Sequence, residues 1–341
     1  MSGAGLLPFL PDLWLAPIFA VLMGFSMLLY AVLDGFDLGV GILLRATPDE
    51  EERDRMVASI GPFWDANETW LVLGVGLLLV AFPTAHGIIL TALYLPVALM
   101  LAGLILRGVA FEFRAKAVAS QKPRWDLAFQ FGSILTAAAQ GWMLGDYILG
   151  FPEGWVGNVF GIIIGIGVVG GFALLGATWL VWRAESTLQV RAVGWARTAL
   201  VFAALGIGIV SVATPWVSPE IFARWFRLPE LLMLAPIPLA TLGLFAVAWV
   251  TLGRLPRRDH SLDWVPFAAT TGITVLCFHG LAYSFWPYVV PGQMTIWQAA
   301  SAPEALRVIL IGAMVVLPMI VGYTVFVWRV FGGKAGALRY E

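Results

Sequence analysis

The stretch Trp64-Asp65-Ala66-Asn67-Glu68-Thr69-Trp70 opens an apolar run that extends to about residue 82. The run is long enough to cross a lipid bilayer, which takes about 20 apolar residues. Carboxylates and an amide are costly to bury in lipid, and inside a membrane-spanning run they indicate a functional site. A second acidic stretch, Asp34-Gly35-Phe36-Asp37, lies late in the preceding apolar run. We therefore expect the function to depend on what these acids face.

The composition is that of an integral membrane protein. Of 341 residues, 60% are hydrophobic and 12% are charged, whereas a soluble domain carries about 25% charged residues. The single cysteine, Cys277, excludes a disulfide framework, an iron–sulfur cluster held by this chain alone and a CxxCH haem attachment. Met1 to Asp12 lacks the basic start of a signal peptide, so we expect the first apolar run to be retained as a helix.

The apolar runs predict an all-α fold with nine membrane-spanning helices. Their expected ranges are 14–44, 62–82, 87–111, 127–149, 156–182, 198–214, 231–252, 264–285 and 305–331. We expect residues 1–341 to form a single membrane domain. The charged run at 48–55 predicts a short solvated helix that serves as a polar connector.

Basic residues are unevenly divided between the two sides of the predicted membrane. Arg224, Arg227 and Arg307 fall on one side, and the other 17 of the 20 Lys and Arg residues fall on the opposite side. By the positive-inside rule, the side with 17 basic residues is cytoplasmic. With nine spans, the N-terminus is then outside and the C-terminus is cytoplasmic.

With this orientation, polar residues of the first three helices converge on one layer in the cytoplasmic half. The layer comprises Asp34, Asp37, Asp65, Glu68, Arg107, Glu112 and Arg114. Carboxylates packed this closely can hold and pass protons near neutral pH. The alternative is a structural lock, in which Arg107 pairs with Asp37 and the acids of the second helix stabilise its N-terminus. One pair suffices for a lock, so four or more acids favour proton transfer for the layer as a whole.

Histidines are too few to suggest a bis-histidine haem site in this chain. His86 is expected at an outer helix end, His260 in a cytoplasmic loop and His279 inside the eighth helix. Only His279 is placed for a buried ligand, and a hydrogen-bonded core residue is the simpler interpretation. The chain also has no GxGxxG motif opening a βαβ unit, no Walker motif and no HExxH motif. We therefore expect no metal ligands and no nucleic-acid partner.

Three motifs follow one another within the first 114 residues. They are Ala31-Val32-Leu33-Asp34-Gly35-Phe36-Asp37-Leu38-Gly39-Val40-Gly41, then Trp64-Asp65-Ala66-Asn67-Glu68-Thr69-Trp70, then Arg107-Gly108-Val109-Ala110-Phe111-Glu112-Phe113-Arg114. In order and spacing they resemble the signature segments of subunit II of cytochrome bd-type quinol oxidases. The third motif looks most like that of the cyanide-insensitive branch.

This resemblance implies two four-helix bundles, within 1–150 and 156–285, and a peripheral ninth helix at 305–331. It implies a complex of the bacterial inner membrane that oxidises quinol and reduces O₂ to water. In that family a larger subunit I carries haems b558, b595 and d, and subunit II ligates none of them. Some members hold a structural quinone in subunit II, and a small third subunit is a further partner to consider.

The resemblance also implies roles for the motif residues. The proton route comprises Asp37 and Asp65, extended to Asp34, Glu68 and Glu112. The oxygen path or subunit contact comprises Trp70, Trp64 and Asn67. The charge partners are Arg107 and Arg114.

Two other functions stay open at this point. Intramembrane acids also form proton relays in carriers, so a proton-coupled secondary transporter is the main alternative. Transporters commonly have repeated halves with substrate groups near the bilayer midplane, whereas the acids here lie in one half of the chain and at the cytoplasmic layer. A purely structural membrane partner is the third possibility.

Overall fold

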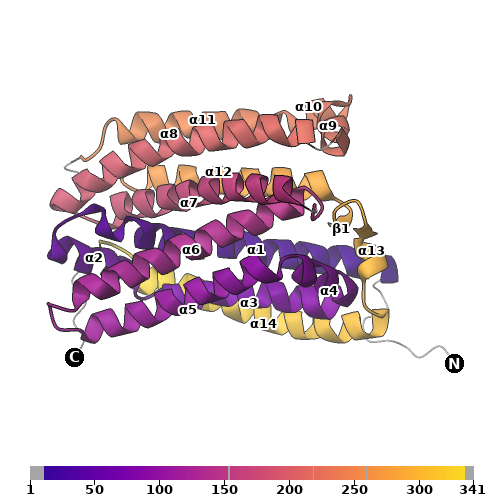
Figure 1. Ribbon diagram of the computed structural model, residues 1–341, viewed down its shortest axis with the longest axis horizontal. Helices are drawn as coiled ribbons and strands as arrows, with labels where there is room; N and C mark the ends of the chain where they lie inside the picture. The colour runs from indigo at the N-terminus through magenta and orange to yellow at the C-terminus, as the bar shows by residue number, and fades with distance from the viewer. Residues whose placement is uncertain (1–10, 153, 218, 258–259, 335–341) are drawn as a thin grey trace.

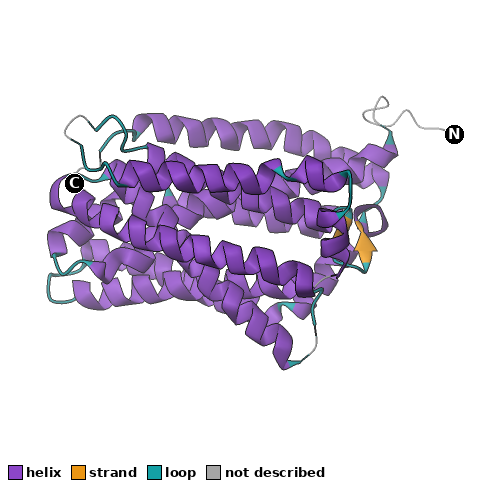
Figure 2. Cartoon of the chain, turned by 90° about the horizontal axis from the view of Figure 1, so that it is seen from above, coloured by secondary structure: helices purple, strands orange, loops and turns teal. Residues whose placement is uncertain are grey.

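The protein is a set of long helices that lie side by side along one axis (Figures 1 and 2). The computed structural model describes residues 11–152, 154–217, 219–257 and 260–334. The long helices are α1 (Asp12–Leu43), α3 (Trp64–Ala81), α5 (Tyr94–Lys116), α6 (Lys122–Ile148), α7 (Trp155–Arg183), α8 (Ser186–Val217), α11 (Pro236–Leu252), α12 (Val265–Phe285) and α14 (Pro303–Val330). The described chain is mostly helical, which confirms the predicted all-α class.

Short elements cap the two ends of the molecule. They are η1 (Leu44–Ala46), α2 (Glu50–Ile60), α4 (Pro83–Ala92), α9 (Pro219–Phe226), α10 (Glu230–Leu234), β1 (Tyr288–Val290), β2 (Met294–Thr295) and α13 (Ile296–Ala299). β1 and β2 pair antiparallel, with Tyr288 opposite Thr295. This hairpin lies at the end of the molecule opposite α2 (Figure 1).

The helices α1 and α7 lie at the centre of the fold. α1 packs on α3, α6, α7 and α12, and α7 packs also on α6, α8 and α12. α11 completes one side by packing on α8 and α12. In Figure 1, α8 and α11 form one edge of the molecule, and α3, α5 and α14 form the other. The acidic segment of α1 is therefore enclosed by neighbouring helices, and all residues from Val32 to Gly41 are buried.

Seven described helices are long and apolar enough to cross a membrane, or eight if the bent pair α2–α3 forms one span. The seven include α1, α5, α7, α8, α11, α12 and α14. α6 is not among them, although its length of 27 residues would suffice, because polar residues such as Gln130 and Gln140 interrupt its apolar sequence. The predicted count of nine spans and the predicted division into two four-helix bundles therefore stay predictions.

Several predicted boundaries were wrong, and prolines explain two of them. The predicted helix 87–111 is two helices, α4 and α5, which meet at Leu93. Pro96 has no N–H and its ring crowds the carbonyl four residues earlier, so a continuous helix is broken there. The predicted helix 231–252 is likewise divided into α10 and α11, and Pro236 begins α11.

The largest boundary error concerns α8, which begins 12 residues before the predicted start at residue 198. Arg191 and Arg197 therefore lie in the first turns of a helix and not in a loop. A helix satisfies its own backbone hydrogen bonds, so it can continue past the lipid into water with charged residues on its surface. The segment between α8 and α10, where no helix was predicted, contains the short helix α9.

The two ends of the molecule differ in charge. α1 and α14 run in the same direction, from the end with the β1–β2 hairpin to the end with α2 (Figure 1). Arg53, Arg114, Lys122 and Arg329 belong to elements or helix ends on the α2 side. Arg258 and Arg339, which also entered the predicted orientation, lie outside the described residues.

Candidate functional site

Arg107 brings together carboxylates from two other helices. Its Nη2 atom lies 2.6 Å from Asp34 Oδ1 on α1 and 2.7 Å from Glu68 Oε1 on α3. Arg107 itself belongs to α5 and is buried. One guanidinium group therefore connects α1, α3 and α5.

Asn67 makes a second connection between α1 and α3. Its Nδ2 donates to Asp37 Oδ2 at 2.7 Å and, more weakly, to the carbonyl oxygen of Leu33 at 3.3 Å. Asp37 Oδ1 and Arg107 Nη1 are buried without a hydrogen-bond partner among the described residues. We call the five residues Asp34, Asp37, Asn67, Glu68 and Arg107 the Arg107 cluster.

The acidic side chains of α3 and α1 differ in how far they are exposed to solvent. Asp65, in the first turn of α3, is exposed, whereas the Glu68 side chain one turn further is 26% exposed. Asp34 and Asp37 are completely buried. The structure thus places carboxyl groups at three levels, from the surface to the interior of the helix bundle.

Not all predicted layer residues come together. Glu112 lies near the C-terminal end of α5 and is exposed. Arg114 turns away from the Arg107 cluster and binds Asp126 and Asp54. The Arg107–Asp37 pair considered as a structural lock is not formed, because the guanidinium binds Asp34 and Glu68 while Asp37 receives an amide hydrogen bond.

The two tryptophans of the α3 motif have different surroundings. Trp70 is buried and meets Phe25 of α1 edge to face, with 6.1 Å between ring centroids. Trp64 is partly buried and lies against Phe111 of α5, with 4.9 Å between centroids. Trp70 therefore belongs to the apolar interior beyond Glu68, and Trp64 fills the space between α3 and α5.

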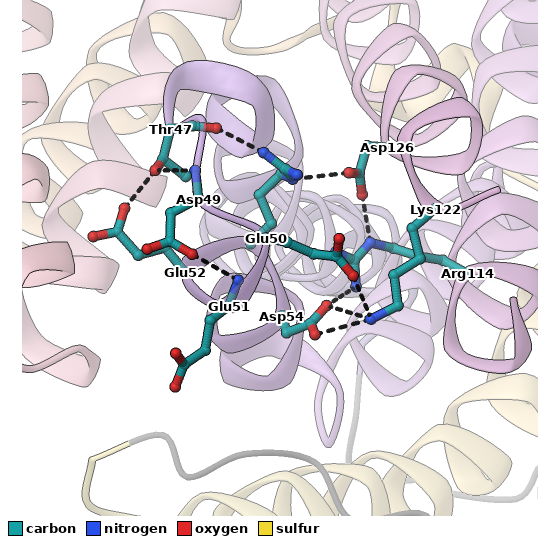
Figure 3. Close-up of polar contacts among 10 residues, drawn as sticks. Thr47, Asp49, Glu50, Glu51, Glu52, Asp54, Arg114, Lys122 and Asp126 are labelled. Atoms are coloured by element: carbon teal, nitrogen blue, oxygen red, sulfur yellow. Dashed lines mark hydrogen bonds and ion pairs between the residues drawn. The ribbon is translucent and has the colours of Figure 1, made fainter. Parts of the chain in front are cut away.

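A second polar cluster lies at the end of the molecule formed by α2 (Figure 3). Asp126 of α6 binds Arg114 of α5 at 2.5 Å through Oδ1 and Arg53 of α2 at 2.9 Å through Oδ2. Arg114 also binds Asp54 of α2 at 2.8 Å. Lys122 binds Asp54 at 3.0 Å and Glu50 at 3.1 Å. We call these six residues, Glu50, Arg53, Asp54, Arg114, Lys122 and Asp126, the Asp126 cluster.

Ion pairing determines the direction of the pKa shifts of Asp54 and Lys122, two partly exposed members of the Asp126 cluster. Burial alone would raise the pKa of Asp54, but hydrogen bonds and charges from Lys122 and Arg114 outweigh it and hold the pKa below its ordinary value. Burial alone would lower the pKa of Lys122, and the carboxylates of Asp54 and Glu50 raise it above its ordinary value. These groups are therefore ionised at neutral pH.

Sequence reasoning missed this second cluster. The charged helix at 48–55 was expected, but it was interpreted as a solvated connector, whereas α2 is ion-paired to α5 and α6. Asp126 provided a usable signal, because it is an acid at the start of a long apolar run. The reasoning that selected Asp65 and Glu68 applies equally to Asp126.

The described histidines do not present a matched pair of haem ligands. His279 was expected to be a core residue, but it is exposed on α12, and its Nδ1 lies 2.8 Å from the carbonyl oxygen of Val275. His260 Nδ1 pairs with the buried Asp263 at 2.8 Å. His86 lies on a different element, α4. Within the described residues, no group of three or more His, Cys, Asp or Glu side chains could hold a metal ion.

Comparison with known proteins places the chain in a family. A family model described as cytochrome bd terminal oxidase subunit II matches residues 15–331. Cytochrome bd-I ubiquinol oxidase subunit 2 of Escherichia coli K12 is 27% identical over 354 residues, which cover 92% of this chain and 93% of that protein. Cytochrome bd ubiquinol oxidase subunit 2 of Bacillus subtilis is 29% identical over 343 residues, covering 94% and 96% of the two chains.

The fold agrees with these matches. A chain in the structure of bd oxidase from Geobacillus thermodenitrificans has a TM-score of 0.78 and 16% sequence identity, covering 93% of this chain and 98% of that one. The matches decide between the open alternatives in favour of the oxidase and against the carrier. Because the family model spans almost the whole sequence, the chain belongs to the family of subunit II of cytochrome bd terminal oxidases.

Proposed function

We propose that this chain delivers protons from the cytoplasmic side to a haem-bearing subunit I, through the Arg107 cluster. As a member of its family, the chain is a subunit of a quinol:O₂ oxidoreductase complex of a bacterial membrane. Reduction of O₂ to water consumes protons, so the complex needs a route that supplies them. Our proposal gives subunit II a part of that route.

One observation carries the proposal: polar contacts link a partly exposed carboxyl group to fully buried ones across three helices. Glu68, at 26% exposure, shares Arg107 with the buried Asp34. Asn67 lies next to Glu68 in sequence and binds the buried Asp37. A proton taken up near Asp65 therefore has acceptor groups at successive depths, ending at Asp37.

Charge balance distinguishes this cluster from a simple lock. The cluster contains three carboxyl groups, Asp34, Asp37 and Glu68, and one guanidinium, which binds Asp34 and Glu68. If all three were ionised, one positive charge would have to compensate three negative ones in a desolvated place, which is costly. A proton is the further positive charge that such a cluster can accept and give up. Asp37 is the best acceptor, since within the described residues Asp34 and Glu68 are ion-paired with Arg107 whereas Asp37 receives only an amide hydrogen bond and has an unpartnered Oδ1.

The remaining parts of the assignment rest on the family and on charge. We place haems b558, b595 and d in subunit I, and we assign no haem ligand to this chain. We assign the α2 end of the molecule to the cytoplasm because basic residues gather there, so that the N-terminus is periplasmic in a bacterial inner membrane.

Trp70 and Phe25 would border an apolar path for O₂ beside the proton route. A structural quinone, a small third subunit and membrane lipid are further partners that the family suggests.

The test is the Asp37→Asn variant in the purified complex. The amide cannot take up and release a proton, while its size preserves the packing. We expect quinol-driven O₂ consumption to fall by about tenfold or more, because losing a proton-transfer group typically costs about 10²-fold or more. The visible spectrum should show the same haem content as in the unmodified complex, so that failed assembly is excluded.

Glu304→Gln provides the matched control. Glu304 is an exposed acid in the first turn of α14, at the end of the molecule opposite α2. This variant should retain full O₂ consumption. If Asp37→Asn also turned over at the full rate with normal haem content, Asp37 would have no part in proton delivery and the proposed function would be wrong.

A further inference from the structure

The helix α2 is tied to three other helices by charged side chains. Arg53 and Asp54 connect it to α6 and α5 within the Asp126 cluster. On another side, Glu52 is buried and pairs with Arg191 of α8 at 3.1 Å. A helix of 11 residues is only marginally stable by itself. Its position is therefore set by contacts with its neighbours: the burial of Met56, Val57 and Ile60 in the core holds one face, and these ion pairs hold the charged side chains.

Asp126 is the central member of the cluster. It is 1% exposed, and each of its oxygens faces a different arginine, Arg114 of α5 and Arg53 of α2. Arg114 is also buried and reaches on to Asp54 of α2. α2 thus meets the Asp126–Arg114 pair at two points (Figure 3). Without the carboxylate of Asp126, two arginines would face each other in a largely buried place.

The position of α2 determines where α3 begins. Three residues, Gly61 to Phe63, connect the two helices, which are bent by 47° relative to each other. The first two turns of α3 then carry Asp65, Asn67 and Glu68. Asn67 binds Asp37 and Glu68 binds Arg107, and these two contacts build the Arg107 cluster. A shift of α2 would therefore be passed on directly to these two contacts.

We propose that Asp126 is a positioning residue for proton delivery: by binding Arg53 and Arg114 together, it fixes α2 and thereby the place at which α3 presents its acids. This inference rests on the proposed function. Asp126 neither donates nor accepts the transferred protons. It acts through α2, and its charged neighbours are Arg53, Glu50 and Asp54 of α2, Arg114 of α5 and Lys122 of α6.

The test combines two measurements on the purified complex. Hydrogen–deuterium exchange of the peptide that covers residues 50–60 reports whether α2 is held in place. Quinol-driven O₂ consumption between pH 6 and pH 9 (about the usable range of such assays) reports proton delivery. The variants are Asp126→Asn, Arg53→Gln and the conservative Asp126→Glu. The control is Arg55→Gln, because Arg55 also lies on α2 but, among the residues that the structure describes, pairs only with the exposed Glu51, 2.6 Å away.

We expect Asp126→Asn and Arg53→Gln to speed exchange in α2 and to lower turnover by about two- to tenfold, the range of effects for residues that act through a neighbouring element. The loss of turnover should grow as the pH rises, because a low proton concentration makes proton delivery the rate-limiting step. Asp126→Glu should bring the exchange rate in α2 and the turnover most of the way back to those of the unmodified complex. Arg55→Gln should change neither the exchange rate nor the turnover. If the Asp126→Asn complex does not assemble, Arg53→Gln alone decides, since it removes the ion pair with Asp126 and the hydrogen bond to the Thr47 carbonyl oxygen and leaves the Asp126–Arg114 pair intact.

Two outcomes would overturn the proposal. In the first, exchange in α2 is the same in Asp126→Asn, Arg53→Gln and the unmodified complex. In the second, α2 is loosened but turnover is unchanged or falls by one constant factor at every pH, which would make Asp126 only structural. Failure of the proposed function is recognised separately, because Asp37→Asn would then keep full turnover whatever happens to α2.

Discussion

At the scale of single residues, the Arg107 cluster depends on one side chain. Nη2 of Arg107 makes both ion pairs that hold α1 and α3 to α5 at this depth. Asp34 has no exposed surface, so its charge depends on this guanidinium for compensation. Buried ion pairs contribute little compared with apolar packing, but removal of one partner is strongly destabilising because the other charge stays buried.

Replacement of Arg107 by methionine should therefore destabilise the complex. Arg107→Met keeps most of the side-chain volume and removes the charge, which should cost about 3–5 kcal/mol. Thermal melting of the purified complex, followed by tryptophan fluorescence, would measure the loss as a lower Tm. Arg55→Gln is the control, since an exposed pair four residues apart on a helix contributes only about 0.3–0.5 kcal/mol. Equal melting temperatures for the two variants would contradict this account of Arg107.

At the scale of helices, α1 and α7 approach each other so closely that their backbones touch. A methyl group on Gly39 would overlap the carbonyl oxygen of Phe172 and lie 2.6 Å from the amide nitrogen of Gly176. A methyl group on Gly176 would in turn overlap the backbone of Gly39 and Val40. Small residues allow such approach in membrane helices, where packing contributes much of the association energy. This contact holds Asp37 and Asp34 on the buried side of α1.

Gly39→Ala should disrupt this contact. The added methyl group meets backbone atoms, which cannot rotate away as a side chain can. We therefore expect a destabilisation of about 1–3 kcal/mol or more, measured as a lower Tm of the purified complex. The matched control is Gly76→Ala on α3, where nothing lies within 4 Å of the added carbon. That change should be neutral or stabilising by up to about 1 kcal/mol, because alanine favours a helix. A Gly39→Ala complex as stable as Gly76→Ala would show that the helices can separate at no cost.

The sequence predicted elements better than it predicted contacts. The range 264–285 matched α12 to within a residue, because a long apolar run is a strong signal. The break at Leu93 was missed, although Pro96 marked it. That Asp34, Asp37 and Glu68 lie near one another along the helix axes followed from the order and direction of the helices. Which acid Arg107 binds did not follow, because a small rotation of α1 decides between Asp34 and Asp37. The role of Arg114 depended in the same way on Asp126, which lies 12 residues later in the first turns of α6.

At the scale of the whole molecule, the direction of the helices and the distribution of charge agree. α1 and α14 run the same way, so the start of α1 and the end of α14 lie at opposite ends (Figure 1). The Asp126 cluster, Arg191 and Arg329 lie at the α2 end, and the β1–β2 hairpin lies at the other. A membrane perpendicular to the helices would have the start of α1 and the end of α14 on different sides. The proposed proton uptake near Asp65 would then take place on the same side as these basic residues.

Reporter fusions would test this arrangement directly. Green fluorescent protein fused to the C-terminus should fluoresce, and alkaline phosphatase at the same place should be inactive, because the basic end stays in the cytoplasm. Alkaline phosphatase inserted at Gly292 should be active, since this residue lies in the β1–β2 turn with nothing within 4 Å of its Cβ position. Insertion at Ser120, in the turn between α5 and α6, is the control and should leave the phosphatase inactive. Activity at both insertion sites, or at the C-terminus, would contradict the orientation and with it the cytoplasmic source of the protons.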